Sequence, residues 1–289
     1  MLLRWLRPAR RRARRRRLMG KRTLAHLAIL ALLALYMLPI AWMLSTALKP
    51  DEELFTEQIR WVPNRIAWEN YQQALATFPF GLYLRNTVLI AGLTVVGALL
   101  SCLPPAYAFA RLRWRGRGFW FWVMLSTLML PPQVTLLPVF LLFRKLGWVD
   151  TFLPLIVPAF LGNAFLIFML RQFFLTLPQE LIDAARLDGC NEWTILWRLV
   201  TPMSKPAVAT VALFSFVWAW TDFMNPLIYL NDSSKFTLAV GLQYFLGRHG
   251  EQWNLLMAAA TVVTAPLVLL FVLTQRAYVR GITLTGLKG

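Results

Sequence analysis

Six long apolar stretches constrain the fold of this chain more than any other feature of its sequence. A helix needs about 20 apolar residues to cross a bilayer. The 289-residue chain is 58% hydrophobic, with a mean hydropathy of +0.55, and such values exclude an ordinary soluble domain. We therefore predict an all-α, polytopic membrane protein. Its six predicted transmembrane helices are Leu24–Leu48, Asn86–Ala110, Phe119–Leu130, Phe152–Phe174, Ala207–Leu230 and Leu255–Val279.

The third of these stretches is the shortest. Pro131 and Pro132 interrupt it, and a second apolar piece, Val134–Phe143, follows. Proline lacks the amide hydrogen that a helix interior needs. We expect the second piece to form a short helix that lies on, or re-enters, the outer face.

The basic residues predict the orientation of the spans. With six spans both termini lie on one side, which then holds 22 of the 30 basic residues, 11 of them within the first 22 positions. Cytoplasmic segments are enriched in Lys and Arg, so both termini are predicted to be cytoplasmic. This explains the net charge of +17 without a nucleic-acid partner, and we expect the basic start to lie near membrane lipid. The predicted parts are a basic tail (1–23), a six-span domain (24–279) and a cytoplasmic tail (280–289).

A polar island, residues 177–206, separates the fourth and fifth spans. Its first half reads as a short helix after Pro178, with Leu177, Leu181, Ala184 and Ala185 at helical spacing. Gly189 lies where a helix ends in a left-handed residue. The second half begins at Asn191, a residue type that caps helices. Its expected apolar stripe is Trp193, Leu196, Trp197 and Val200, and Pro202 and Pro206 are expected to end it.

The island also carries a more specific pattern, Asp183-Ala184-Ala185, then Gly189, then Pro202. This spacing resembles the EAA loop of the permease subunits of ABC importers. Residues 106–113, 220–223 and 275–289 look like the carbohydrate branch of that family, of the maltose-importer type. The resemblance implies a type I ABC-importer permease fold with a cytoplasmic coupling helix, in a prokaryotic inner membrane.

The resemblance also implies partners. They are a second homologous permease subunit, two ATPase subunits and an extracytoplasmic solute-binding protein, which together import a sugar or related polyol. The residues implied to contact an ATPase subunit are Glu180, Asp183, Ala184, Ala185, Asp188, Gly189 and Pro202. The C-terminal residues Gly286, Lys288 and Gly289 are implied to reach the ATPase interface.

Asp222 is the single acid inside a predicted span, and Asn225 shares its helical face. A charge in a bilayer is costly, so Asp222 should face protein or water. It could line the translocation pathway, or it could form a hydrogen-bonding clamp near the interface. A stand-alone secondary transporter with Asp222 as a proton or solute site is the alternative function.

No catalytic motif is present in the sequence. The phosphate-binding pattern G-x-x-x-x-G-K-[ST] is missing, so we do not expect this chain to hydrolyse ATP. His26 and His249 lie on opposite sides of the predicted membrane, so no metal site is predicted. We expect no cofactor on this chain, with ATP and Mg bound by the partner ATPase subunits.

Overall fold

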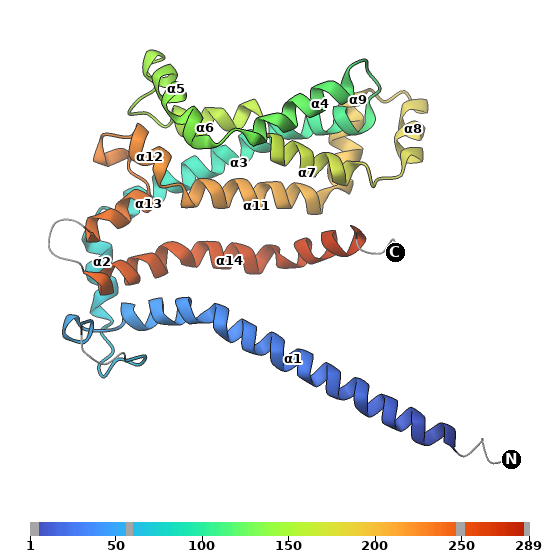
Figure 1. The fold of residues 1–289 in the computed structure, drawn as a ribbon. Coiled ribbons are helices and arrows are strands. Elements are labelled where there is room, and N and C mark those ends of the chain that lie inside the picture. The colour runs from blue at the N-terminus through green and yellow to red at the C-terminus, as the bar shows by residue number, and fades with distance from the viewer. Residues whose placement is uncertain (1–5, 56–59, 247–251, 286–289) are drawn as a thin grey trace. The chain divides into compact units, whose positions relative to one another are not determined.

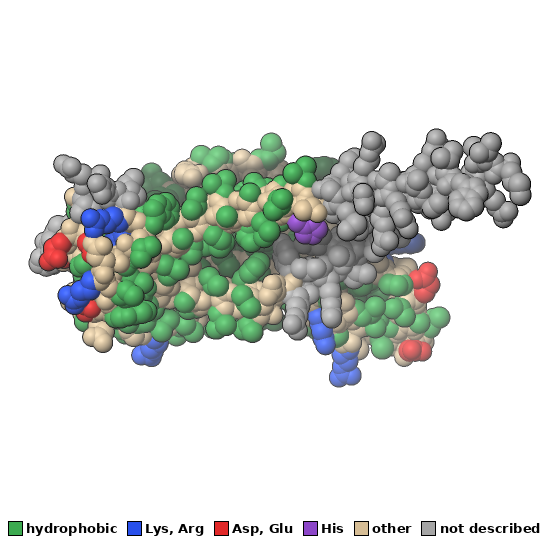
Figure 2. Space-filling view, turned by 90° about the horizontal axis from the view of Figure 1, so that it is seen from below, with side chains coloured by type: hydrophobic (Ala, Val, Ile, Leu, Met, Phe, Trp, Pro, Cys, Tyr) green, Lys and Arg blue, Asp and Glu red, His purple; other side chains and the backbone are tan. Residues whose placement is uncertain are grey.

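The computed structural model describes residues 6–55, 60–246 and 252–285, and every regular element in these ranges is helical. Four helices are long and apolar enough to cross a membrane. Two further pairs of helices, each bent at a short break, raise the number to six if each pair is one span. The prediction of an all-α, multi-span protein is confirmed. Hydrophobic side chains predominate on the face in Figure 2, with charged side chains toward its two ends.

The chain divides into two compact units. The first comprises Met1–Ala74 and Glu251–Thr261, and the second Leu75–Gly250 and Val262–Gly289. The division passes through α14 (Trp253–Thr285), which contributes residues to both units. The predicted division into two tails and a six-span domain stays a prediction.

In the first unit, two asparagine side chains donate hydrogen bonds to backbone carbonyls at the end of α1 (Leu6–Ala47). Asn70, in α2 (Glu69–Ala76), donates from Nδ2 to the carbonyls of Ala47 at 3.0 Å and Lys49 at 2.8 Å. Asn254 donates to the same Lys49 carbonyl at 3.3 Å. The last carbonyls of a helix have no intrahelical donor, so these amides satisfy groups that would otherwise be buried unpaired.

In the second unit, α3 (Phe80–Arg111) is the central element. It runs alongside α7 (Ala164–Phe174) and α11 (Lys205–Thr221), as Figure 1 shows. Helix α3 continues through the Pro104–Pro105 pair. The core between these helices is built from buried side chains that include Leu103, Leu170 and Val211.

The third predicted span is broken as the prolines indicated. α4 (Arg117–Ser126) and the 3-10 turn η3 (Thr127–Met129) meet α5 (Pro132–Lys145) at a bend of 96°. The fourth span is also interrupted. It consists of α6 (Leu153–Ile156), η4 (Val157–Leu161) and α7, joined through Gly162 at φ 90°.

The predicted fifth span, Ala207–Leu230, was too long. Helix α11 ends at Thr221, because Asp222 has extended geometry (ψ 117°), and a separate short helix α12 (Met224–Tyr229) follows. After it come η6 (Ser233–Lys235), α13 (Leu238–Gly241) and η7 (Leu242–Phe245). The pattern of apolar residues continues through the break, so hydropathy alone did not reveal it.

Candidate functional site

The polar island, called here the polar loop (residues 177–206), folds into two short helical pieces. The first is α8 (Gln179–Leu187). It ends at Gly189, which has φ +80° as predicted. The second piece begins at Asn191, whose side-chain oxygen accepts the Thr194 amide at 2.8 Å, and so caps α9 (Glu192–Thr194) as predicted.

The second piece continues differently from the prediction. Ile195–Val200 forms a π-helix, η5, which leads into α10 (Thr201–Met203). Pro202 therefore lies inside helical structure, and the chain turns at Ser204 instead, with an 85° bend into α11. A helical proline clashes with the carbonyl four residues earlier, and the wider π-turn before Pro202 makes room for it.

The inward faces of both pieces also differ from the predicted stripes. Ile182, which the predicted stripe omitted, is buried in the core at 1% exposure, whereas Leu181 is 43% exposed. In the second piece Ile195, Leu196 and Val200 are buried, and the two tryptophans of the predicted stripe are exposed. The π-turn changes the register, because it places residues five apart on one face.

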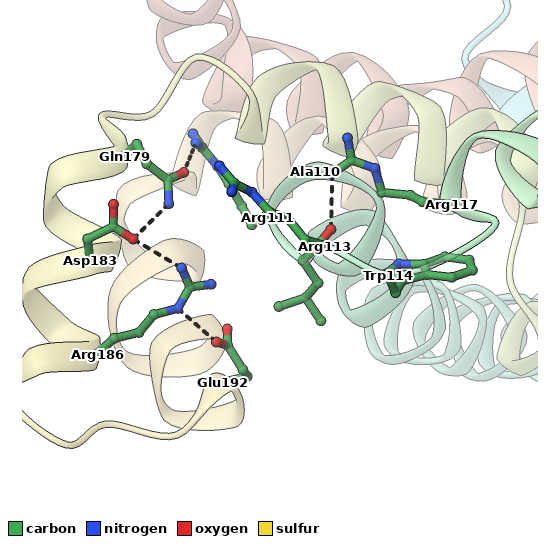
Figure 3. A pocket seen from close by; sticks show the side chains of 10 residues that line it. Ala110, Arg111, Arg113, Trp114, Arg117, Gln179, Asp183, Arg186 and Glu192 are labelled. Carbon is green, nitrogen blue, oxygen red and sulfur yellow. Dashed lines mark hydrogen bonds and ion pairs between the residues drawn. The ribbon is translucent and has the colours of Figure 1, made fainter.

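A closed polar ring fastens the loop to α3. It is made by Tyr107, Arg111, Gln179, Asp183, Arg186 and Glu192. Figure 3 shows these side chains except Tyr107.

The hydrogen bonds of the ring follow one another from residue to residue. The Tyr107 hydroxyl donates to Glu192, which accepts from Arg186 Nε at 2.9 Å. Arg186 Nη1 donates to Asp183 Oδ1 at 3.0 Å, and the same oxygen accepts from Gln179 at 3.0 Å. Gln179 Oε1 accepts from Arg111 at 2.7 Å. The two ring residues that belong to α3, Tyr107 and Arg111, therefore lie on one face of that helix, one turn apart.

The ring has a clear electrostatic character. Glu192, through its hydrogen bond, and the carboxylates around Arg186 raise the pKa of that guanidinium. Arg186 forms ion pairs with both Asp183 and Glu192. Hydrogen bonds to charged groups are about twice as strong as neutral ones. The ring and the burial of Ile182 together hold α8 in one orientation.

The opposite face of α8 is open to solvent. Its exposed residues are Glu180, Leu181, Ala184, Leu187 and Asp188, while Asp183 is also exposed but lies on the side of the polar ring. Leu187 is 90% exposed. Of the other residues predicted to contact an ATPase subunit, Ala185 packs partly against the core. Gly189 and Pro202 are exposed. Gly286, Lys288 and Gly289 lie outside the described residues.

The sequence reasoning missed Gln179, Arg186, Tyr107 and Arg111. A signal for the first two was present, because Gln179, Asp183 and Arg186 follow the i, i+4, i+7 spacing that places polar side chains on one helical face. No local pattern connects that face to Tyr107 and Arg111, which lie more than 60 residues earlier.

Asp222 and Asn225 lie together, at the break between α11 and α12. Asp222 Oδ1 accepts the Asn225 amide at 3.2 Å, and Oδ2 accepts the Asn225 side chain at 2.8 Å. The carboxylate thus forms a local clamp across the break. A place on the translocation pathway stays a prediction. Within the described residues, no group of three His, Cys, Asp or Glu is arranged to hold a metal ion.

The fold and the polar loop define an integral membrane protein that presents a fixed amphipathic helix outside its spans. A family model described as the binding-protein-dependent transport system inner membrane component matches residues 94–284. The chain belongs to this family, and the predicted resemblance to sugar-importing ABC permeases is confirmed.

Several characterised relatives cover most of the chain. The arabinooligosaccharides transport system permease protein AraQ of Halalkalibacterium halodurans is 33% identical, over 91% of this chain and 94% of its own length. The sulfoquinovosyl glycerol transport system permease protein SmoH of Agrobacterium fabrum is 32% identical, over 87% and 88%. The maltose/maltodextrin transport system permease protein MalG of Salmonella typhimurium is 32% identical, over 92% and 95%.

A solved structure supports the same fold. A bacterial ABC transporter involved in the import of the acidic polysaccharide alginate contains a chain that superposes with a TM-score of 0.78. The two chains are 26% identical, and the match covers 90% of this chain and 96% of the other. The predicted ABC-importer permease fold is confirmed, as is a multi-pass inner-membrane component. The alternative of a stand-alone secondary transporter finds no support in these relatives.

Proposed function

We propose that this chain is a permease subunit of an ABC importer for a sugar or related polyol, and that it forms half of the translocation pathway. The names of its relatives support the solute class, since arabinooligosaccharides, sulfoquinovosyl glycerol and maltodextrins are polyhydroxylated molecules. The partner subunits also contribute to the choice of the particular solute. We propose that both termini and the polar loop face the cytoplasm, in line with the charge distribution.

The proposed assembly contains a second homologous permease subunit, two ATPase subunits and an extracytoplasmic solute-binding protein. In this assembly ATP and Mg bind to the ATPase subunits. The polar loop of this chain docks on one ATPase subunit, and its C-terminal residues Gly286, Lys288 and Gly289 reach the same interface.

The observation that carries the docking proposal is the contrast between the two faces of α8. Its inner face is fixed by buried Ile182 and by the polar ring. Its outer face combines the exposed Leu187 with the small Ala184 and the acid Glu180. A small residue beside an exposed leucine lets another protein approach closely, and burial of the leucine side chain in the contact is favourable.

This arrangement converts docking into movement of the spans. A force applied to α8 passes along the chain into α7 and α11, which flank the polar loop in sequence. It also passes through the polar ring into the end of α3, because Tyr107 and Arg111 belong to that helix. Three packed spans therefore receive the displacement together, as a rigid body would.

The test is the substitution Ala184→Arg, which places a long cation in the middle of the exposed face. We expect the ATPase subunit to be lost from the affinity-purified transporter, and ATP-dependent uptake in vesicles to be lost with it. Gln172→Arg is the matched control, because this exposed residue at the end of α7 receives the same side chain away from α8. Full ATPase association in the Ala184→Arg variant would refute the docking role of this face.

A further inference from the structure

Two hollows adjoin one another at the end of α3 that carries the polar loop. The first is a cavity of about 1100 Å³ between the turn 111–117 and the polar loop (Figure 3). The second is a groove of about 540 Å³ that runs along α3, α4 and α7. Trp114 lines both hollows. The two hollows therefore meet at Trp114, and together they are called here the depression, with a polar part and an apolar part.

The polar part carries more positive charge than its own acids neutralise. Four arginines and two acids line it, and both acids, Asp183 and Glu192, form ion pairs with Arg186. Arg111, Arg113 and Arg117 have no carboxylate within 4.0 Å among the described residues. Arg117 donates to the Leu112 carbonyl at 3.0 Å, and Arg113 is exposed. An uncompensated cluster of this kind attracts an anion.

The apolar part has few polar groups, and its hydrogen-bond donors without a partner among the described residues are the indole N–H groups of Trp114 and Trp120. Its lining is mostly aromatic and aliphatic, and it includes Phe109, Trp120 and Met124. The two hydroxyls in it are already used, since Ser101 donates to the Ala159 carbonyl at 2.8 Å and Thr127 to the Met124 carbonyl at 2.7 Å. A groove lined mainly by aromatic and aliphatic side chains is suited to a hydrocarbon chain.

The surrounding surface places this depression at a membrane interface. Phe119, Trp120 and Trp122 are 66%, 55% and 71% exposed beside it. Exposed aromatic residues next to arginines are typical of the level of lipid headgroups. The amphipathic character of the depression therefore matches a lipid, whereas a soluble anion would use only its polar part.

We propose that an anionic phospholipid binds in this depression. Its phosphate lies between Arg113 and Arg117, and one acyl chain lies along the groove past Trp114 and Met124. Two charges facing one headgroup favour an anionic lipid over a zwitterionic one, since each basic residue near an anionic surface contributes about 1 kcal/mol. The lining of this site does not include Glu180, Ala184 or Leu187 of the exposed face of α8.

The first experiment is a titration of the detergent-purified transporter complex with phosphatidylglycerol and with phosphatidylcholine, followed by native mass spectrometry. We expect the unsubstituted protein to retain phosphatidylglycerol preferentially. The double substitution Arg113→Gln and Arg117→Gln should weaken that retention about five-fold for each charge removed. Lysine at both positions should restore it, which separates a loss of charge from a loss of folding.

The matched control removes two cations elsewhere. Arg144→Gln with Lys145→Gln, at the exposed end of α5, should leave phosphatidylglycerol retention unchanged. Equal loss in the control, or equal retention in the Arg113 and Arg117 double variant, would overturn the proposal.

A second experiment identifies the occupant of the groove. A photo-crosslinking amino acid at Met124 should label phosphatidylglycerol in the assembled transporter. Labelling of another protein subunit instead would show that protein fills the groove. Displacement of the lipid by inorganic phosphate alone would show that the site recognises a free anion. Either result would overturn the lipid assignment.

Discussion

Tyr107 offers the sharpest test of the polar ring. Its side chain is 3% exposed, and its hydroxyl donates to the carboxylate of Glu192. The substitution Tyr107→Phe removes this one oxygen and keeps the aromatic packing. A hydrogen bond to a charged group contributes about 1.5–3 kcal/mol, and the phenylalanine ring cannot replace it. We therefore expect the ring to open about 30-fold more often, which corresponds to about 2 kcal/mol.

The expected consequence is a weaker mechanical link, with the fold and the docking face intact. Backbone amides of α8 should exchange hydrogen faster in the Tyr107→Phe variant, because release of the ring exposes them. In proteoliposomes that contain the complete transporter, less solute should be imported per ATP hydrolysed, while the ATPase subunit remains bound. This pattern differs from that of Ala184→Arg, which should abolish association itself.

A control and a double-mutant cycle complete the test. Tyr36→Phe, on the exposed face of α1, makes the same chemical change without touching the ring and should have no effect. Combining Tyr107→Phe with Glu192→Gln should cost less than the sum of the two, because both remove one shared hydrogen bond. Additive effects, or unchanged amide exchange in α8, would show that the ring does not fasten the loop.

Two further predictions concern single residues, Gly189 and Asp150. Gly189→Val should destabilise the corner after α8 by about 1–2 kcal/mol, because φ +80° is unfavourable for a residue with a side chain. No atom lies within 4 Å of the added Cβ, so backbone strain alone destabilises the variant. A thermal unfolding midpoint equal to that of the unsubstituted protein would contradict this reasoning. The amide of Asp232, the ammonium of Lys235 and the amide of Asn231 lower the pKa of Asp150 from 3.8 to about 2. This contribution to stability is therefore complete above pH 4 and is lost as the pH falls from about 4 to about 2. Asp150→Asn keeps the φ of 60° accessible and should flatten the thermal stability of the protein over that pH range; an unchanged profile would exclude Asp150 as its source.

The features that the sequence predicted well are those with a local cause. Gly189 and Asn191 were placed correctly, because a left-handed helix end and a side-chain cap depend on one or two neighbouring residues. The break at Pro131–Pro132 was placed for the same reason. The family pattern across residues 183–202 then gave the class of protein, since its spacing is specific.

The features that were missed have non-local causes. The burial of Ile182 and the outward orientation of the tryptophans in the second helical piece depend on the helices that pack against the polar loop. An ideal 3.6-residue period could not anticipate the π-turn in Ile195–Val200, which shifts the register of that piece. The break at Asp222 was hidden because its flanks are equally apolar, and hydropathy measures composition without reporting backbone geometry.

The attachment of the polar ring to Tyr107 and Arg111 has a consequence for the length of α3. These two anchors follow the Pro104–Pro105 pair, where the helix lacks amide donors. Four residues span about 6 Å along an α-helix but about 13 Å when extended. The ring joins Tyr107 and Arg111 at their helical spacing, so it holds the last turn of α3 at its helical length. While the ring is closed, a displacement of α8 moves that last turn as one piece, and any stretching of α3 falls on the preceding turn at Pro104 and Pro105, which the ring does not span.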